Sequence, residues 1–373
     1  MVLSLYELAW KPAAAMLRRT DPQVAHARTV ALLRRSDDVA PLGSLARLAN
    51  RYAFPDAPTR VGGVMLPHPL ILAAGLVKGD GFPDETSALA AVGRHCNIVP
   101  GWRSLPALVG PVEFGSFTRH PRLGNAGRVL WRNEAARSMQ NRVGLRNPGA
   151  RAAASYLRSK ARRLPASWGV NLAVSPGLDD LEEGALEVQD SASYFVSAFS
   201  GVRRSPSWYT LNLSCPNTAD DPRAHQTEAQ ARRLCEALAD RVDAPLWVKV
   251  GPDLSNEQLS ALVRVFSDCG VRAVVATNTV ARRVPGGSLT AGLSGAPLRT
   301  AALGTVRQLA AVIGNDGVDL DVVACGGIMR GADLTAFQAA GARAAMIYSA
   351  LVFRGPLAAA LILRESERRG RDG

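Results

Sequence analysis

The sequence lacks the features of a membrane-spanning, secreted or metal-binding protein. No apolar run approaches the roughly 18 residues that a transmembrane helix needs, and the N-terminus has no signal-peptide pattern. The five cysteines are an odd number without a CxxC pair, which argues against a disulfide framework, a zinc site or an iron–sulfur site. They suggest free thiols in a reducing compartment, and we expect no metal site.

Acidic residues are outnumbered: 32 Asp and Glu against 44 Lys and Arg give a net charge of +12. Such an excess suits nucleic acid, an anionic membrane or an anionic small substrate. The chain has no zinc-finger spacing and no basic stretch interleaved with aromatic residues, so we expect no nucleic-acid partner. The 373 residues suffice for one large α/β domain and an accessory segment.

Strand-like and helix-like runs alternate from about residue 69 onward, which predicts βα units and a parallel sheet. Eight such units fit a (β/α)₈ barrel of the TIM type, although an open doubly wound sheet alternates in the same way. The expected strands are Pro69–Ala74, Val112–Phe117, Trp168–Leu172, Ser207–Leu213, Leu246–Val250, Arg272–Thr277, Leu320–Cys325 and Arg343–Tyr348.

Polar or glycine residues stand at or just past the C-terminal end of every expected strand. In a barrel these positions converge on one mouth, whereas an open sheet would spread them along its edge. The pattern therefore favours the barrel. The residues are Lys78, Ser116, Asn171, Asn212, Lys249, Asn278, Gly326-Gly327 and Tyr348-Ser349.

The stretch Asn212–Thr218 crowds two carboxamides, hydroxyls and a thiol onto the end of one strand, where Pro216 stops it. A plain turn rarely needs all of these groups, and loops at strand ends often carry function. Lys249 lies within an apolar strand, and buried lysines need a partner, so it is expected to face an anion or an electron-rich ring. The glycines after the seventh strand suggest backbone binding of a phosphate.

Residues 1–60 form a separate helical segment, and the barrel is expected over residues 61–373. Asp21-Pro22 reads as a helix N-cap and first position. An earlier stretch places Leu5 and Leu8 on one face, with Tyr6 and Trp10 as expected interfacial residues. Such basic amphipathic helices either lie on an anionic bilayer surface or pack on the barrel, and the residues alone do not decide.

From Pro12 to Pro356 the chain resembles the dihydroorotate dehydrogenase family, FMN-dependent (β/α)₈ enzymes of pyrimidine synthesis. The N-terminal stretch Asp21–His26 looks like that of the quinone-using, membrane-associated class 2 branch, which favours the membrane for residues 1–60. The matching motifs are Ala73–Lys78, Glu113–Thr118, Gly124-Asn125, Asn141–Leu145, Gly169–Asn171, Asn212–Thr218, the stretches around Lys249 and Asn278, Gly292–Gly295, Ile347–Ser349 and Arg354–Pro356.

The resemblance implies roles for the matching residues, with Cys215 as base and Lys249 beside the flavin N1/O2 edge. The FMN site would comprise Ala74, Gly75, Ser116, Asn171, Asn212, Lys249, Thr277, Gly295, Gly326, Gly327, Tyr348 and Ser349. The dihydroorotate site would comprise Lys78, Asn141, Gly144, Leu145, Asn212, Asn217, Asn278 and Thr279. A quinone tunnel would include His26 and Arg132, for which a helix-packing His and a surface Arg are the alternatives.

The implied activity is oxidation of dihydroorotate to orotate, with electrons passed to a membrane quinone by an enzyme on the inner face of the cell membrane. Cys215 departs from class 2, which usually carries serine at the base position, and an inert buried cysteine is the alternative. The loop after Thr218 also departs from the family's pattern. A paralogue acting on another dihydropyrimidine or enone, or a non-catalytic flavin protein, therefore remains open.

A segment at residues 94–111 looks like an insertion before the second strand. Such αβ segments lie at the face of a barrel that serves stability, so we expect it to be neutral for the chemistry. The sequence gives no indication of the oligomeric state.

Overall fold

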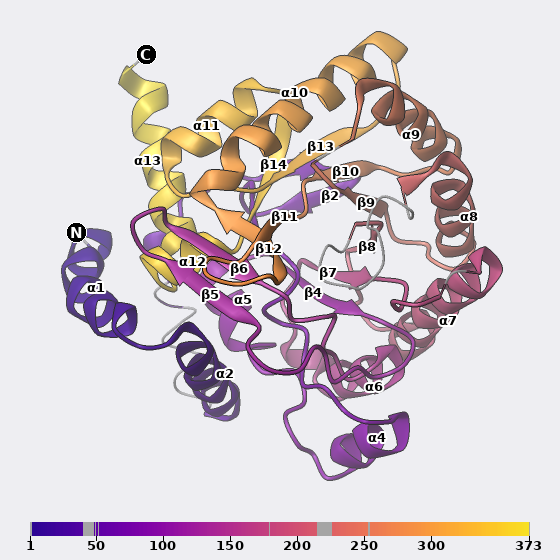
Figure 1. The fold of residues 1–373 in the computed structure, drawn as a ribbon, viewed down its shortest axis with the longest axis horizontal. Helices are drawn as coiled ribbons and strands as arrows, with labels where there is room; N and C mark the ends of the chain where they lie inside the picture. The colour runs from indigo at the N-terminus through magenta and orange to yellow at the C-terminus, as the bar shows by residue number, and fades with distance from the viewer. Residues whose placement is uncertain are drawn as a thin grey trace.

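The computed structural model describes residues 2–39, 48, 50, 52–178, 180–214, 226–252 and 254–372. Eight parallel strands close into a barrel surrounded by helices (Figure 1), in the order β10-β13-β14-β3-β4-β7-β8-β9. The predicted TIM barrel is confirmed, and the open sheet is wrong. The strands, each within two residues of its expected ends, are β3 (Leu70–Leu72), β4 (Val112–Phe117), β7 (Trp168–Leu172), β8 (Trp208–Asn212), β9 (Leu246–Val250), β10 (Ala273–Ala276), β13 (Asp321–Cys325) and β14 (Ala342–Ile347).

The helices that follow the strands bury one apolar face each against the outside of the barrel. Side-chain caps set several of their starts: Ser255 and Gln258, for example, form a capping box at α9. The helices around the barrel are α4 (Glu85–Gly93), α5 (Ser104–Val109), α6 (Ala150–Ser159), α7 (Leu181–Phe199), α8 (Glu228–Ala239), α9 (Asn256–Asp268), α10 (Arg299–Asp316), α11 (Gly331–Ala339), α12 (Ser349–Arg354) and α13 (Ala358–Asp372).

Inside the barrel, side chains become more polar toward the C-terminal ends of the strands. Alternate residues of a strand share one face, so Trp208, Thr210 and Asn212 of β8 rise in one column. Trp208 stacks on Trp247 with ring centroids 4.8 Å apart, near the N-terminal ends of the strands. Gly169 makes room for this layer, since a Cβ there would lie 2.1 Å from the Trp208 ring. The apolar floor therefore supports a polar upper half.

Two small antiparallel sheets were not predicted from the sequence. The hairpin of β1 (Thr59–Val61) and β2 (Val64–Leu66) packs on the floor, where the Trp247 indole donates to the Gly62 carbonyl at 3.0 Å. A four-stranded sheet, in the order β11-β12-β6-β5, joins the loop after β4 to the loop after β10 (Figure 1). Its strands are β5 (Leu130–Asn133), β6 (Ser138–Asn141), β11 (Val280–Arg283) and β12 (Thr290–Gly295).

Two N-terminal helices, α1 (Val2–Arg18) and α2 (Pro22–Asp38), lie outside the ring of barrel helices (Figure 1). Asp21 caps α2 as predicted, accepting from the amides of Gln23 and Val24. The expectation that Tyr6 faces a membrane interface is wrong. Its hydroxyl donates to the Arg354 carbonyl at 2.9 Å, and its ring stacks on Trp10, so both rings lie against the turn between α12 and α13.

The segment at residues 94–111 contains α5 and anchors α2. The carboxylate of Asp37 on α2 is buried, and burial raises its pKa. It accepts from the amides of Gly101, Arg103 and Ser104, from the Ser104 hydroxyl and from the Asn97 amide group, at 2.7–3.2 Å.

The same segment also reaches the loop that follows β3. The Ile98 carbonyl accepts from the Asp80 amide at 2.9 Å, and Asp80 lies two residues after Lys78. The expectation that this segment lies wholly at the stability face of the barrel is therefore wrong. Its first part contacts the loop after β3, at the C-terminal ends of the strands, and α5 then leads to the start of β4.

Replacing Asp37 by asparagine is expected to lower the free energy of unfolding by about 2–3 kcal/mol, because the new amide nitrogen would face buried donors. Thermal and urea unfolding measure the loss. The control is Asp38→Asn on the exposed neighbouring position, which should change stability by less than about 0.5 kcal/mol. Equal stability of the two variants would contradict the anchoring role of Asp37.

Candidate active site

Polar side chains from three barrel strands and one following loop form a continuous hydrogen-bonded chain. The Ser116 hydroxyl of β4 donates to the Asn171 side-chain oxygen on β7. The Asn212 amide group of β8 donates to the Ser116 oxygen at 3.4 Å, and the Asn278 amide group donates to the Asn212 oxygen at 3.4 Å. Four residues predicted to bind cofactor or substrate therefore meet, although they span more than 160 positions of sequence.

Lys249 stands beside this chain on β9, where it pairs in register with Asn212. Its side chain is buried, with 7% of the residue exposed. No ion pair to a carboxylate is recorded for it within the described part of the chain, so its cation remains available for a bound anion or an electron-rich ring. Its charge acts on the nearby thiol of Cys325, whose pKa is nevertheless raised by burial.

The loop after β3 brings Ala74, Gly75 and Lys78 to the same end of the barrel. The Gly75 amide donates to the Gly115 carbonyl at 2.7 Å. Gly75 has φ +119°, and a Cβ there would lie 3.4 Å from the Tyr348 ring. The predicted flavin-lining residue and the predicted phosphate-binding residue are therefore neighbours.

The glycines after β13 form a close approach between two backbones. Gly327 has φ +74°, and a Cβ at this position would lie 2.5 Å from the backbone nitrogen of Arg299, where α10 begins. Nearby, the Ser349 hydroxyl donates to the Ser294 oxygen at 3.0 Å, and Gly295 is the next residue along β12. Gly295, Gly327 and Ser349 thus come from segments that meet at one corner of the barrel, as predicted.

The loop after β10 contributes Thr277, Asn278 and Thr279. The buried Thr277 is held by its amide, which donates to the Cys325 carbonyl at 2.6 Å, and by its hydroxyl, which donates to the Asn278 carbonyl at 2.8 Å. The Thr279 hydroxyl is buried without a hydrogen-bond partner among the residues described. Because such a group is costly to leave unsatisfied, it suits a ligand that supplies the partner.

Asn141, Gly144 and Leu145 belong to the edge formed by β6 and the loop after it. Asn141 pairs with Gly292 of β12 and donates to its carbonyl at 3.5 Å. Gly144 has φ +71° and Leu145 φ +51°. A Cβ at Gly144 would meet the Asn125 amide group at 2.7 Å. The four-stranded sheet thus orients these predicted substrate residues.

His26 lies near the loop that carries Lys78. Burial, and then the charges of Lys78 and Arg146, lower its pKa to about 4, so the imidazole is neutral at pH 7. Arg132 is not a surface residue: its side chain is 8% exposed and ion-paired with Glu134. It also donates to the carbonyls of Leu17 and Thr20 at 2.9 Å each. These bonds give a partner to backbone carbonyls at the C-terminal end of α1, which have none within the helix.

The predicted base Cys215 and the predicted clamp Asn217 lie outside the described residues. The residues on either side of them are held to β9. The Ser214 hydroxyl donates to the Lys249 carbonyl at 3.4 Å, and the Gln226 side-chain oxygen accepts from the Gly251 amide at 2.7 Å.

Two interior residues of this region were given no role by the sequence. Glu113 and Thr210 are fully buried in the barrel, and the Thr210 hydroxyl bonds the Glu113 carboxylate. Lys249 was identified because a charged residue stands within an apolar strand. Glu113 has the same pattern, and the same criterion would have identified it as a candidate.

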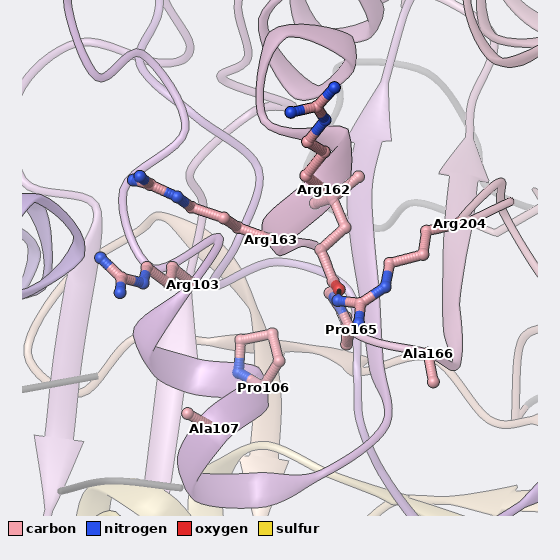
Figure 2. Close-up of a pocket in the computed structure, with 9 residues that line it drawn as sticks. Arg103, Pro106, Ala107, Arg162, Arg163, Pro165, Ala166 and Arg204 are labelled. Carbon is pink, nitrogen blue, oxygen red and sulfur yellow. Dashed lines mark hydrogen bonds between the residues drawn. The ribbon is translucent and has the colours of Figure 1, made fainter. Parts of the chain in front are cut away.

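A cavity of about 520 Å³ lies elsewhere, among the segments that lead into β4, β7 and β8. Arg103, Arg162, Arg163 and Arg204 line it, but Figure 2 shows their guanidinium groups pointing in different directions. Arg204 donates to the Leu164 carbonyl. These segments precede their strands, so the cavity lies at the opposite end of the barrel from the polar chain, and it is not part of the candidate site.

Comparisons with known proteins agree with this geometry. The family model described as dihydroorotate dehydrogenase matches residues 57–369. A protein of Polynucleobacter asymbioticus named dihydroorotate dehydrogenase (quinone) is 32% identical over 350 residues, which cover 90% of this chain and 92% of the relative. A protein of Methylococcus capsulatus with the same name is 32% identical, covering 94% and 96%.

A crystal structure of the dihydroorotate dehydrogenase of Eimeria tenella in complex with ferulenol superimposes with a TM-score of 0.74. It covers 95% of this chain and 93% of the other at 21% identity, and this likeness shows the shared fold. The family match, the curated relatives and the assembled strand ends lead to one conclusion: the chain belongs to the dihydroorotate dehydrogenase family.

Proposed function

We propose that this protein oxidises dihydroorotate to orotate and passes the electrons to a quinone, as a step of pyrimidine synthesis. The observation that carries the proposal is the hydrogen-bonded chain of Ser116, Asn171, Asn212 and Asn278 beside the buried Lys249. A carboxylated pyrimidine requires cations and several carboxamides, and these residues supply them at one end of the barrel.

FMN is the cofactor that these residues fit. Lys249 would lie at the N1/O2 edge of the ring, where a cation stabilises negative charge. Two features of the site support the fit: the glycine at position 327, whose backbone has φ +74° and packs on the start of α10, and the half-buried carboxamides of Asn212 and Asn278 at the strand ends. When bound, FMN supplies a two-electron acceptor for hydride from C6 of dihydroorotate. Its ring would contact Ala74, Gly75, Ser116, Asn171, Asn212 and Thr277, and its phosphate Gly295, Gly326, Gly327, Tyr348 and Ser349.

The substrate would lie above the ring, against the loops that follow β3, β6 and β10. Lys78 provides a cation for the carboxylate, and the orphan hydroxyl of Thr279 gains a partner. The carboxamides of Asn212 and Asn278 face the pyrimidine amides. Asn141, Gly144, Leu145 and Asn217 complete the proposed substrate site.

Cys215 is the proposed base that removes the proton from C5. A thiol with a reference pKa of about 8.5 is a far better proton acceptor at neutral pH than a serine hydroxyl. Residues 212–214 come directly from β8, and Ser214 is tied to Lys249. The thiol therefore follows a segment that is fixed at the site.

We propose that the N-terminal helices attach the protein to the inner face of the cell membrane. The same helices would form the path by which the quinone reaches the site. No helix in the described ranges is long and apolar enough to cross a bilayer. On α1, however, Leu5, Leu8 and Met16 are 60–67% exposed. Three large apolar side chains on one exposed stripe suit an interfacial helix. The neutral His26 of α2 lies near Lys78 and Arg146, and it is the residue of these helices that we propose to meet the quinone.

Anaerobic mixing with dihydroorotate is the direct test of this function. The purified protein is expected to be yellow and to lose its absorbance near 450 nm at one equivalent of substrate. Adding a soluble quinone should restore the colour. A bound flavin that stays oxidised with excess dihydroorotate, yet bleaches with another dihydropyrimidine or an enone donor, would overturn the substrate and leave the cofactor in place.

Replacing Cys215 by alanine is expected to slow flavin reduction by dihydroorotate by about 10²–10⁴-fold, the usual contribution of a positioned base. Orotate affinity should change little, because the binding residues remain. Cys96→Ala, which removes an exposed thiol, is the control and should reduce at the wild-type rate. Equal rates for both variants in stopped-flow absorbance would show that Cys215 is an inert cysteine.

Replacing Leu5, Leu8 and Met16 by serine is expected to weaken binding to anionic vesicles by at least about tenfold, because the inserted apolar area is lost. Co-sedimentation with vesicles measures it. The matched control replaces Met65, Leu186 and Leu289, three exposed apolar residues far from α1 in sequence. An equal loss in both triple variants would refute a specific membrane face on α1.

A further inference from the structure

Glu113 is a carboxylate buried in the barrel interior, with no accessible surface. One of its oxygens accepts from the Asn171 amide group at 2.9 Å. The other accepts from the Trp208 indole at 3.0 Å and from the Thr210 hydroxyl. Burying a charge is costly unless it is hydrogen-bonded and compensated, so the burial of this carboxylate calls for a structural or functional explanation.

Compensation comes from these three donors. The indole of Trp208 can only donate a hydrogen bond. The position next to it therefore requires an acceptor, and an ionised carboxylate accepts on both oxygens.

The carboxylate also fixes the direction of the bonds that Asn171 and Ser116 make above it. Because Asn171 points its nitrogen at Glu113, its oxygen must face Ser116, and it accepts from that hydroxyl. The Ser116 oxygen is then left to accept from the Asn212 nitrogen, and the Asn212 oxygen accepts from the Asn278 nitrogen. The Asn212 and Asn278 oxygens also accept from the backbone amides of Ser214 and Thr279, at 3.4 and 2.8 Å, so the upper end of the chain is held in this same direction. An amide has one donating and one accepting end, so turning Asn171 over would set its nitrogen against the Asn212 nitrogen at the Ser116 oxygen.

We propose that Glu113 is a positioning residue: its carboxylate holds Asn171 in the direction that matches the upper end of the chain, and so keeps Ser116, Asn212 and Asn278 in the arrangement that receives the flavin and the pyrimidine. This inference rests on the proposed function. Dihydroorotate and orotate alternate N–H donors and carbonyl acceptors around the ring. With Asn171 turned over, the Asn171 and Asn212 nitrogens would compete at the Ser116 oxygen and the Ser116 proton would lose its acceptor, so the site would fit its ligand less well although every side chain were still present.

Glu113→Gln tests the proposal, because it changes one oxygen into a donor at constant shape. Trp208 can only donate, so the oxygen of the new carboxamide must face Trp208 and Thr210, and its nitrogen must face Asn171. Asn171 then turns over, and its nitrogen faces the Ser116 oxygen, which already accepts from the Asn212 nitrogen. We expect orotate to bind about 10–100-fold more weakly, measured by titrating the change in the flavin spectrum at equal flavin content, with a matching rise in KM for dihydroorotate.

Glu187→Gln is the matched control. Glu187 is a carboxylate with 3% of the residue exposed that also accepts three hydrogen bonds, from the Arg119 amide and from the amide and hydroxyl of Ser175. It lies on α7, outside the chain. The substitution is expected to lower stability while leaving orotate affinity within about threefold of wild type, a difference below about 1 kcal/mol.

The double variant Glu113→Gln/Asn171→Asp separates polarity from structure. It exchanges the carboxylate and the carboxamide between the two positions. The amide nitrogen at position 113 then donates to the carboxylate at position 171, which again accepts from Ser116, so the original direction returns above it. We expect the double variant to recover at least about tenfold of the orotate affinity lost in Glu113→Gln. If the single variant does not fold, the double variant is expected to fold and to bind orotate.

Two results would overturn the proposal: wild-type orotate affinity in Glu113→Gln, or a double variant no better than the single one. Failure of the proposed function is distinct from both, since it would appear as a wild-type protein whose flavin spectrum does not respond to orotate or dihydroorotate.

Discussion

Closure of eight parallel strands into one barrel is the constraint on which the rest of this structure depends. Closure brings the C-terminal ends of all eight strands to one rim, so residues between positions 74 and 349 become neighbours. The two-residue period of a strand then sorts the interior into levels. Trp208 and Trp247 form the floor, Glu113 and Thr210 the middle, and Asn212 and Lys249 the rim. The site is the polar end of a core whose other end is apolar.

A polar interior of this kind is stable only if its groups satisfy one another. Each amide, hydroxyl and carboxylate from Glu113 to Asn278 has a partner within the barrel. Networks of this sort rigidify the residues that they include, and a site whose dipoles are already oriented needs no rearrangement when its ligand arrives. The hydrogen bonds that make the buried polar groups tolerable are therefore the same bonds that orient the groups proposed to face the pyrimidine. Stability and recognition cannot be altered independently here.

The sequence predicted the features that repeat and missed those that depend on distant pairing. All eight strands were found, because apolar β-branched runs alternate with helical ones, and the strand-end residues followed from them. The sheet of β5, β6, β11 and β12 was missed, because its strands are short and partly exposed and β6 pairs with β12 about 150 positions away. Tyr6 and Trp10 were misplaced for a different reason. Helix α1 has two apolar faces, and sequence periodicity alone does not say which one the barrel covers.

Those two faces of α1 let one helix pack on the protein and also present the surface that we propose for the membrane. The inward face, with Leu3 and Ala14 buried, packs on the protein, while Leu5, Leu8 and Met16 point outward. Arg132 of β5 binds the C-terminal end of α1. The loop just before β5 binds the start of α2 through the Asp21–Arg128 ion pair. β5 pairs with β6, which carries Asn141, one of the proposed substrate residues. A single hairpin, β5 and β6, thus connects the proposed membrane-facing helices to the edge of the sheet that carries Asn141.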